Sequence, residues 1–164
     1  MNQIVTTQST LRLPEELVSS AIFLLKRLGM AAKSDTLEAY EGTGLHPYHH
    51  AILALLDEGT TETQGAIGEA LGYDKGQLVG MLDELEDAGL IERKRDLADR
   101  RRHVVQMTAE GRSALGRLRR LSRRIENEFL APLDEVERAQ LHGLLLRLAK
   151  HHVPSCAGKA DGAP

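Results

Sequence analysis

The side chains most able to act chemically in this chain are the arginines of the stretch 92-ERKRDLADRRRHVVQMT-108. Residues 92–124 carry twelve Arg or Lys against four Asp or Glu, a net charge of +8, so the rest of the 164-residue chain carries −11 beneath an overall charge of −3. Guanidinium groups bind phosphate and carboxylate groups through paired hydrogen bonds, and a localised positive field attracts a polyanion. The pattern predicts a surface for an acidic partner. For residues 112–124 alone, a solvated helix face is an equal alternative.

A second group with chemical potential is the H-x-x-H-H cluster of His46, His49 and His50. Imidazoles at this spacing suit zinc, but no carboxylate or Cys beside them in the sequence completes a ligand set. We therefore favour hydrogen-bonded or solvated histidines and predict neither a metal site nor a cofactor. The single cysteine, Cys156, excludes an internal disulfide. No nucleophile, phosphate-loop or metalloprotease motif is present, so we expect no enzyme.

Two short helices precede the basic stretch. Helical spacing of apolar residues predicts a helix over 63–71, a turn at Gly72–Tyr73, and a second helix over 74–88 that is capped by Asp74 and ended by Gly89. Two short helices joined by a tight turn form a helix-turn-helix, whose second helix fits the major groove of DNA.

The basic stretch itself alternates apolar and polar residues on either side of a polar turn. Residues 90–93 and 103–107 therefore read as the arms of a β-hairpin, with Val105 and Met107 on one face. Thr108 can cap a long helix over about 109–130. A helix-turn-helix followed by a hairpin predicts a mainly α fold with a small β-hairpin, that is, a winged helix-turn-helix flanked by N- and C-terminal dimerisation helices.

The flanking helices carry apolar stripes that the small central part cannot cover. One helix is predicted to run from Pro14 to about residue 41, and the last one ends near residue 151. A second copy of the chain is the natural cover and would give a two-fold dimer. No apolar run approaches the about 18 to 20 residues that cross a bilayer, and the first residues lack a signal-peptide pattern, so we expect a cytoplasmic protein without a membrane partner.

Two segments carry a resemblance to a known family. The segments 82-LDELEDAGLIER-93 and 96-DLADRRRHVVQMTAEG-111 resemble the end of the recognition helix and the wing of the multiple antibiotic resistance regulator (MarR) family, and the similarity covers residues 45–111 well. It implies a homodimer that binds palindromic double-stranded DNA operators, usually as a repressor, and that often leaves DNA when a small aromatic compound binds. We expect one domain over 1–164, with dimerisation helices over 11–44 and 109–152, a DNA-binding lobe over 45–108 and a flexible tail over 153–164.

The resemblance places the wing tip in a minor groove, where narrow A·T-rich tracts accept a guanidinium group. Arg101 is the first candidate for insertion and Arg100 the second, and the remaining candidates of the wing are Arg102 and Arg95. Asp96 and Asp99 are expected to support the arginines, because DNA phosphates repel a carboxylate.

The second helix of the motif, 75-KGQLVGMLDEL-85, departs from the family pattern. Lys75 is expected to reach a phosphate and Gln77 to pair with adenine. Gly76 and Gly80 cost about 1 kcal/mol each relative to Ala, which either close approach to DNA or close packing inside the protein would explain. The acids Asp83 and Glu84 favour an alternative function, a winged-helix module that docks another protein and reads no DNA.

The start of the second helix of the chain borders the ligand cleft of the family. By resemblance, Tyr48, His49 and His50 are the candidates for contact with an effector. The residues alone leave the effector open, because core and dimer packing explain the apolar stripes equally well.

Overall fold

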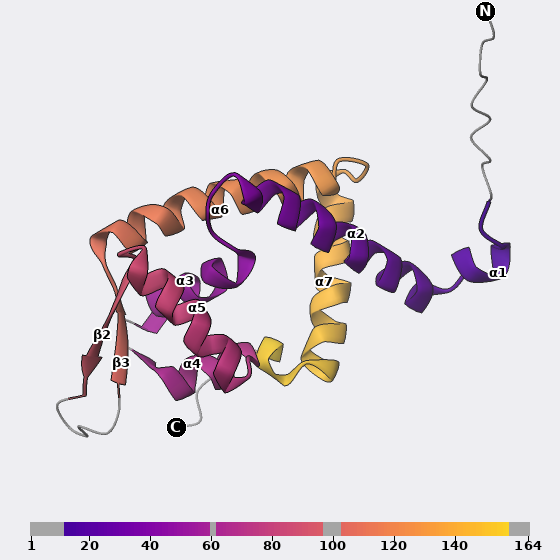
Figure 1. Cartoon of the computed structure of the whole chain (residues 1–164). Helices are drawn as coiled ribbons and strands as arrows, with labels where there is room; N and C mark the ends of the chain where they lie inside the picture. The colour runs from indigo at the N-terminus through magenta and orange to yellow at the C-terminus, as the bar shows by residue number, and fades with distance from the viewer. Residues whose placement is uncertain (1–11, 60–61, 97–102, 158–164) are drawn as a thin grey trace, which may run out of the picture. The chain divides into compact units, whose positions relative to one another are not determined.

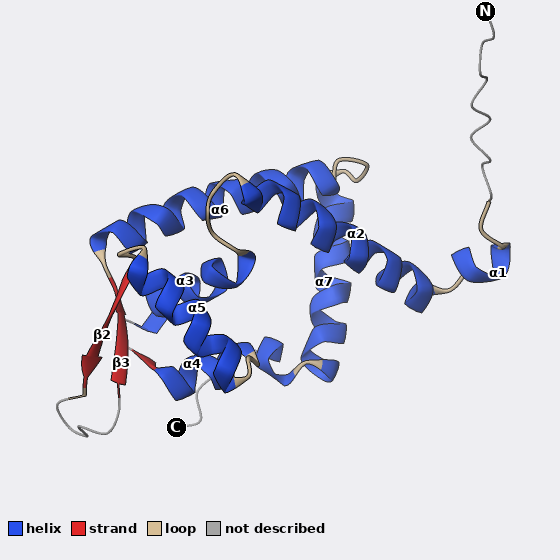
Figure 2. Ribbon diagram, viewed as in Figure 1, coloured by secondary structure: helices blue, strands red, loops and turns tan. Residues whose placement is uncertain are grey.

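The computed structural model describes residues 12–59, 62–96 and 103–157. These residues are mainly helical, with three short strands (Figures 1 and 2). In chain order the elements are α1 (Glu15–Val18), α2 (Ala21–Glu41), α3 (Pro47–Gly59), β1 (Glu62–Thr63), α4 (Gln64–Leu71), α5 (Lys75–Asp87), β2 (Ile91–Arg95), β3 (His103–Met107), α6 (Ala109–Phe129), α7 (Glu135–His152) and the one-turn 3-10 helix η1 (Pro154–Ala157).

The chain divides into two units, residues 1–35 and 36–164. In the first, the single helix predicted from Pro14 is wrong, because α1 ends at Val18 and α2 begins at Ala21. Two serines occupy the break: the Ser19 hydroxyl donates to the Glu16 carbonyl, and the Ser20 hydroxyl accepts from the Phe23 N–H at 3.3 Å. Serine side chains that bond to nearby backbone groups compete with a continuing helix, which explains the interruption.

In the second unit, α3, α4, α5, the strands and α6 enclose one hydrophobic core, and we call residues 45–129 the lobe. Each of its four helices contributes fully buried side chains to that core, as Leu53, Ile67, Leu82 and Leu115 show. In α3, α5 and α6 the buried apolar side chains recur at helical spacing. The core fixes the orientation of α5, since its apolar stripe points inward along the whole helix.

The helix-turn-helix is built by local hydrogen bonds. Thr63 caps α4 by accepting from the Ala66 N–H at 3.2 Å, and Asp74 caps α5 by accepting from the N–H groups of Gly76 and Gln77 at 2.9 and 3.0 Å. Between the helices Gly72 has φ of 67°, the left-handed conformation that glycine adopts without steric cost. The predicted turn and the Asp74 cap are therefore confirmed.

The hairpin is part of a three-stranded antiparallel sheet of order β1-β3-β2, and Figure 1 shows β2 and β3 extending away from the helices of the lobe. Ile91 pairs with Met107 and Arg95 with His103. Val105 and Met107 are buried on one face, as predicted from the alternation. The sequence did not indicate β1, whose two residues pair with Val104 and Val105 across the other edge of β3.

The start of α6 lies against the start of the hairpin. The Thr108 hydroxyl accepts from the Gly111 N–H at 3.0 Å and donates to the Gly89 carbonyl at 2.8 Å. A Cβ atom on Gly111 would lie 2.1 Å from the Leu90 carbonyl oxygen, so only glycine fits there. This contact ties the wing strands to the helix that follows them.

The last helix, α7, begins with a capping box in which Asp134 and Glu137 each accept the backbone N–H of the other at 2.9 Å. In contrast to the helices of the lobe, it has no buried residue. Residues 154–157 of the segment predicted as a flexible tail form η1, and residues 158–164 lie outside the described part of the chain. None of the described helices combines the length and the apolar character needed to cross a membrane.

Candidate nucleic-acid interface

One face of α5 is open to solvent while the opposite face is sealed into the core. Lys75, Gly76, Gln77 and Gly80 are all exposed. A Cβ atom added to Gly80 would meet no described atom within 4 Å, and one added to Gly76 would meet only the Asp74 carboxylate oxygen, at 3.3 Å. Packing within the described part of the protein therefore does not account for Gly80. The open face gives the backbone of α5 room to approach a partner closely.

Two acids of α5, Asp83 and Glu86, have a partner on the hairpin. The Arg93 backbone N–H and Nε donate to Glu86 at 3.0 and 2.9 Å, and its Nη2 donates to both Glu86 and Asp83. The side-chain hydrogen bonds from Arg93 lower the pKa of Glu86 from its ordinary value, and those to Glu86 raise the pKa of Arg93. We call Arg93, Glu86 and Asp83 the wing clamp, because they join β2 to α5.

Because of the wing clamp, not every cation of the basic stretch is free to bind a partner. Arg93 belongs to the basic cluster by sequence, yet its guanidinium is turned toward two carboxylates and its side chain is only 23% exposed. Its charge is therefore largely neutralised inside the lobe. The same contact accounts for Asp83, one of the two acids that favoured a protein-docking function. Sequence reasoning missed the clamp, because the i to i+10 and i to i+7 spacings from α5 to β2 carry no local signal.

The described parts of the wing keep some free positive charge. Arg95 is exposed at the end of β2, and Asp96, the predicted support residue beside it, is half-buried. Lys94 pairs with Glu92. The predicted wing-tip residues Asp99, Arg100, Arg101 and Arg102 lie outside the described residues.

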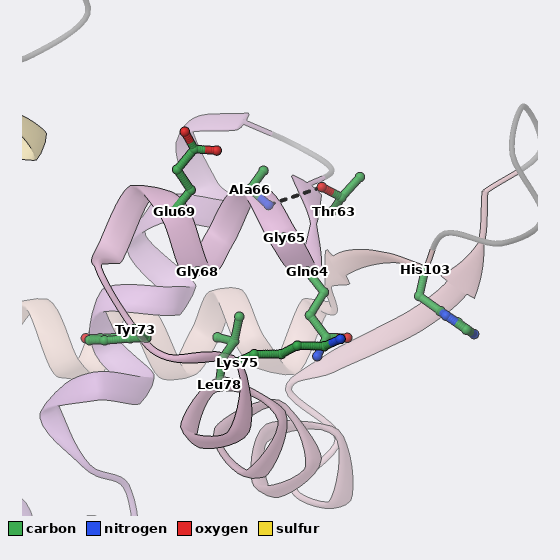
Figure 3. Close-up of a pocket in the computed structure, with 10 residues that line it drawn as sticks. All are labelled: Thr63, Gln64, Gly65, Ala66, Gly68, Glu69, Tyr73, Lys75, Leu78 and His103. Carbon is green, nitrogen blue, oxygen red and sulfur yellow. Dashed lines mark hydrogen bonds between the residues drawn. The ribbon is translucent and has the colours of Figure 1, made fainter.

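An open hollow of about 660 Å³ lies beside the helix-turn-helix (Figure 3). Its lining comes from α4, from Tyr73 and the start of α5, and from the start of β3, and its polar side chains include Thr63, Gln64, Lys75, His103 and the acidic Glu69. The first N–H groups of a helix have no partner within the helix and favour negative charge. With Lys75 and an imidazole on the same rim, the hollow suits an anionic group. His103 was not among the predicted site residues.

The arginines of α6 are partly paired. Arg119 donates to the Asp57 carboxylate at 2.8 Å, Arg117 donates to the Ser113 hydroxyl at 3.0 Å, and Arg124 lies 3.8 Å from Glu128. These contacts favour the solvated-face interpretation for residues 112–124 over a continuous basic surface.

The residues predicted to meet an effector lie in three different environments. Tyr48 is 40% exposed and packs edge-on against Tyr73, His49 is 4% exposed, and the His50 Nδ1 lies 2.7 Å from the Tyr40 hydroxyl. None of the three lines the hollow beside α4. In the described part of the chain, no group of three His, Cys, Asp or Glu side chains is arranged to hold a metal ion.

The exposed second helix, the tight turn before it and the hairpin joined to that helix by the wing clamp define a winged helix-turn-helix protein. A sequence model of the MarR family matches residues 43–102. A regulatory protein of Thauera aromatica, described as acting on the hcr operon, is 34% identical over 105 residues, which are 64% of this chain and 63% of that protein. The chain belongs to the MarR family.

Solved structures agree with this assignment over most of the chain. The transcriptional repressor CouR, bound to a 23-mer DNA duplex, is 32% identical with a TM-score of 0.76, covering 84% of this chain and 99% of CouR. A probable transcriptional regulator from Pseudomonas aeruginosa is 31% identical with a TM-score of 0.71, covering 80% of this chain and 98% of the other. The match to the Thauera protein spans less than two-thirds of its length. The relatives are named as regulators rather than enzymes.

Proposed function

We propose that this protein is a transcriptional regulator that binds double-stranded DNA as a homodimer, most simply as a repressor of genes behind a palindromic operator. The observation that carries the proposal is the open face of α5, where Lys75 and Gln77 are exposed beside two glycines with free space around them. A helix with this face fits a major groove, where Gln77 can pair with adenine and Lys75 can contact phosphate. The likeness to CouR, which was solved on DNA, supports the same function.

The hollow beside α4 provides a seat for one backbone phosphate. The first turn of α4 brings N–H groups and the end of a helix dipole, and Lys75 and His103 bring side chains that can carry positive charge. Phosphate contacts of this kind set the position of a protein on the duplex without reading sequence. They would place the first turn of α5 over the base edges.

The wing supplies the second contact in the proposal. Arg101, with Arg100 and Arg102, inserts into the adjacent minor groove, and Arg95 and Asp96 stand at the base of the wing. Minor-groove width would then contribute much of the specificity, because α5 offers few base-reading side chains. The wing clamp supports this role, since it fixes the hairpin relative to α5.

Release by a small aromatic effector is the finer part of the proposal. A second cavity of about 320 Å³ has apolar walls from Leu45, Leu118 and Leu121, with Thr43 and Arg117 on its lining. Apolar walls with one cationic group suit the ring and carboxylate of an aromatic acid. Tyr48, His49 and His50 lie on the neighbouring helix α3 and remain the other candidates for effector contact.

A gel-shift series with the DNA upstream of the protein's own gene tests the proposal. We expect binding that weakens steeply with salt, by about 0.9 in log K per neutralised phosphate against log salt, and a mass in solution of two chains. Arg101→Ala should lower operator affinity at least tenfold, whereas the matched change Arg124→Ala on α6 should change it less than twofold. Equal binding by Arg101→Ala and wild type would reject the wing contact.

The competing function is a winged-helix module that docks an acidic protein. Its main sequence argument was the glycine-rich α5 with its flanking acids. Both acids have neighbours in the lobe: Asp83 bonds to Arg93, and Glu84 lies 3.0 Å from His49. A protein that bound neither its own promoter nor a random pool of duplex DNA at low salt would favour this alternative over DNA reading.

A further inference from the structure

The first turn of α3 is held by two histidines. The His46 Nδ1 accepts from the Tyr48 backbone N–H at 3.3 Å, and the His49 Nδ1 accepts from the His46 backbone N–H at 3.1 Å. This resembles a capping box, in which Ser or Thr at the cap and Glu or Gln three residues later usually supply the acceptors. It differs in one bond, because the cap residue His46 accepts from the second N–H of the helix, that of Tyr48, and not from the third. Here both acceptors are imidazole nitrogens.

An imidazole nitrogen accepts a hydrogen bond only while it carries no proton. Both Nδ1 atoms of this box must therefore be bare, and each neutral ring carries its proton on Nε2. Protonation of either ring would place an N–H group against a backbone N–H and would convert an attraction into a repulsion. The box therefore holds in the neutral state of the histidines only.

The other nitrogen of His49 faces the recognition helix. His49 is 4% exposed, and its Nε2 is a buried polar atom without an aligned hydrogen-bond partner. It nevertheless lies 3.0 Å from a carboxylate oxygen of Glu84 on α5, a contact of ion-pair distance. His49 is thus the one side chain of the box that touches both the start of α3 and the middle of α5.

We propose that His49 is a positioning residue for DNA binding: its neutral ring holds the start of α3 through the His46 N–H and touches α5, and protonation in mildly acidic solution breaks the bond to His46, lets the ring turn toward Glu84 and lowers operator affinity. The proposal rests on the proposed DNA-binding function. It assigns Glu84 a role as well, because this carboxylate attracts the ring toward α5 in either protonation state. His49 becomes a link between the acidity of the solution and the placement of the recognition helix.

The charged and titratable groups around His49 set the direction of the effect. Among the described residues, α5 presents Glu84 and the turn before α3 presents His46, while Arg119 of α6 acts on the neighbouring His50. Burial lowers the pKa of His49 below the ordinary 6.5, Glu84 opposes this, and His46 adds to it. The unfolded chain therefore binds the proton first, so this contribution to stability is complete above about pH 6.5 and is lost as the pH falls below that value.

His50 acts in the same direction and must be separated from His49. Burial and Arg119 lower the pKa of His50, whose Nδ1 contacts the Tyr40 hydroxyl. This contact does not involve α5. A variant that changes His49 alone therefore isolates the link to the recognition helix.

The decisive variant is His49→Gln, since glutamine is a natural acceptor at this position of a capping box and does not titrate. We expect wild-type operator affinity to fall about tenfold from pH 7.5 to 5.5, because the His49 ring takes up a proton over this range. At pH 7.5 the operator affinity of His49→Gln should be within twofold of wild type. Its affinity should change little when the pH is lowered to 5.5. His142→Gln, which removes an exposed histidine of α7, is the matched control and should keep the fall expected of wild type. An unchanged pH profile in His49→Gln would overturn the proposal.

A measurement without DNA separates this proposal from the proposed function. NMR titration of the His49 ring in wild type and in Glu84→Gln should show a lower midpoint in the variant, because the carboxylate that favours the charged ring is gone. Amide exchange of His46 should quicken as His49 protonates, because the His46 N–H then loses its acceptor. If the protein binds no DNA but the midpoint shifts, the proposed function fails and the capping link stands. Equal midpoints in the two proteins would reject the contact between His49 and Glu84.

Discussion

Leucines of the lobe and leucines of the terminal helices have opposite surroundings. Leu53, Leu82 and Leu115 are at most 1% exposed, whereas Leu144 and Leu148 of α7 are 54% and 48% exposed. The lobe has its own core, so its helices are positioned by contacts within the chain. The exposed leucines of α7 form a row that a single chain leaves open, and rows of this kind mark surfaces for another protein. Here the other protein is proposed to be a second copy.

The N-terminal helices repeat the pattern of α7. Ile22 is 76% exposed, Met30 is 59% exposed and Leu28 is 53% exposed along α2. The lesson is that this chain separates two tasks. On the proposed function, the lobe carries the surface that faces DNA, and the terminal helices carry the exposed apolar surfaces that a second copy would bury.

The largest effect is expected in the core of the lobe. Leu82→Ala removes a fully buried side chain of α5 and should lower the free energy of unfolding by about 2 to 5 kcal/mol. Urea unfolding followed by circular dichroism measures this. The matched change Leu144→Ala on α7, examined at a protein concentration low enough to keep the chains apart, should cost less than about 0.5 kcal/mol. Equal losses of unfolding free energy in the two variants would show that α7 is packed within the single chain as tightly as the lobe is.

Substitutions in the terminal helices should weaken dimer formation rather than the stability of the lobe. The double change Leu144→Glu and Leu148→Glu places two charges on the exposed row of α7, and we expect the dissociation constant of the dimer to rise at least about 100-fold, because burying an unpaired charge is costly. Sedimentation equilibrium gives the constant, and circular dichroism checks that the lobe remains folded. A dimer of unchanged strength would show that α7 is not the interface.

The wing clamp should have an intermediate effect. Glu86→Gln weakens the hydrogen bonds from Arg93 and should cost about 1 kcal/mol of stability, a modest loss because the pair is partly exposed. The pKa of Glu86 is below the ordinary value of 4.5, so its contribution is present above that pH and disappears as the pH falls through the lower folded value. Urea unfolding should therefore show that wild type has the larger free energy of unfolding at pH 7, and that this difference from Glu86→Gln is smaller at pH 3.

The smallest effect on stability has the opposite sign. Gly80→Ala should stabilise the lobe by about 0.5 to 1 kcal/mol, since alanine favours the helix and the added methyl group meets no described atom. If α5 lies close to DNA, the same methyl group should weaken operator binding. Thermal unfolding and a gel-shift assay, run in parallel, check the two directions. A variant that is more stable and binds the operator as tightly as wild type would show that DNA does not closely approach α5 at Gly80.

The helices, their caps and the hairpin were predictable because their signals are local. Asp74, Thr108 and Gly72 hold the positions that the sequence indicated, and the buried faces of α5 and β3 follow from periodicity. The misses involve partners far along the chain. In the sequence Arg93 is one cation of a basic cluster, and only the fold brings the carboxylates of α5 to it. The strand β1 was missed because it has only two residues and no pattern of its own.

The histidine cluster shows the same limit within a single turn. The spacing of His46 and His49 favoured hydrogen-bonded or solvated histidines over a metal site, and both rings are hydrogen-bonded, but their role as backbone acceptors at the start of α3 was not predicted. Serine and glutamate at these positions would have been recognised as a capping box from sequence. Imidazoles are rare in this role, so only the geometry assigns it.

The sheet order also bears on how the protein behaves when it is concentrated. β3, which carries the buried Val105 and Met107, is flanked by β1 and β2. The two edges of the sheet are therefore β1, which is only two residues long, and β2, which carries the charged residues Glu92, Lys94 and Arg95. Charges along an outer strand oppose the stacking of strands from different molecules into fibrils. Precipitation in concentrated samples should therefore arise from the leucine-rich helices, and additives that shield apolar surface, rather than agents that block strand pairing, should keep the protein in solution.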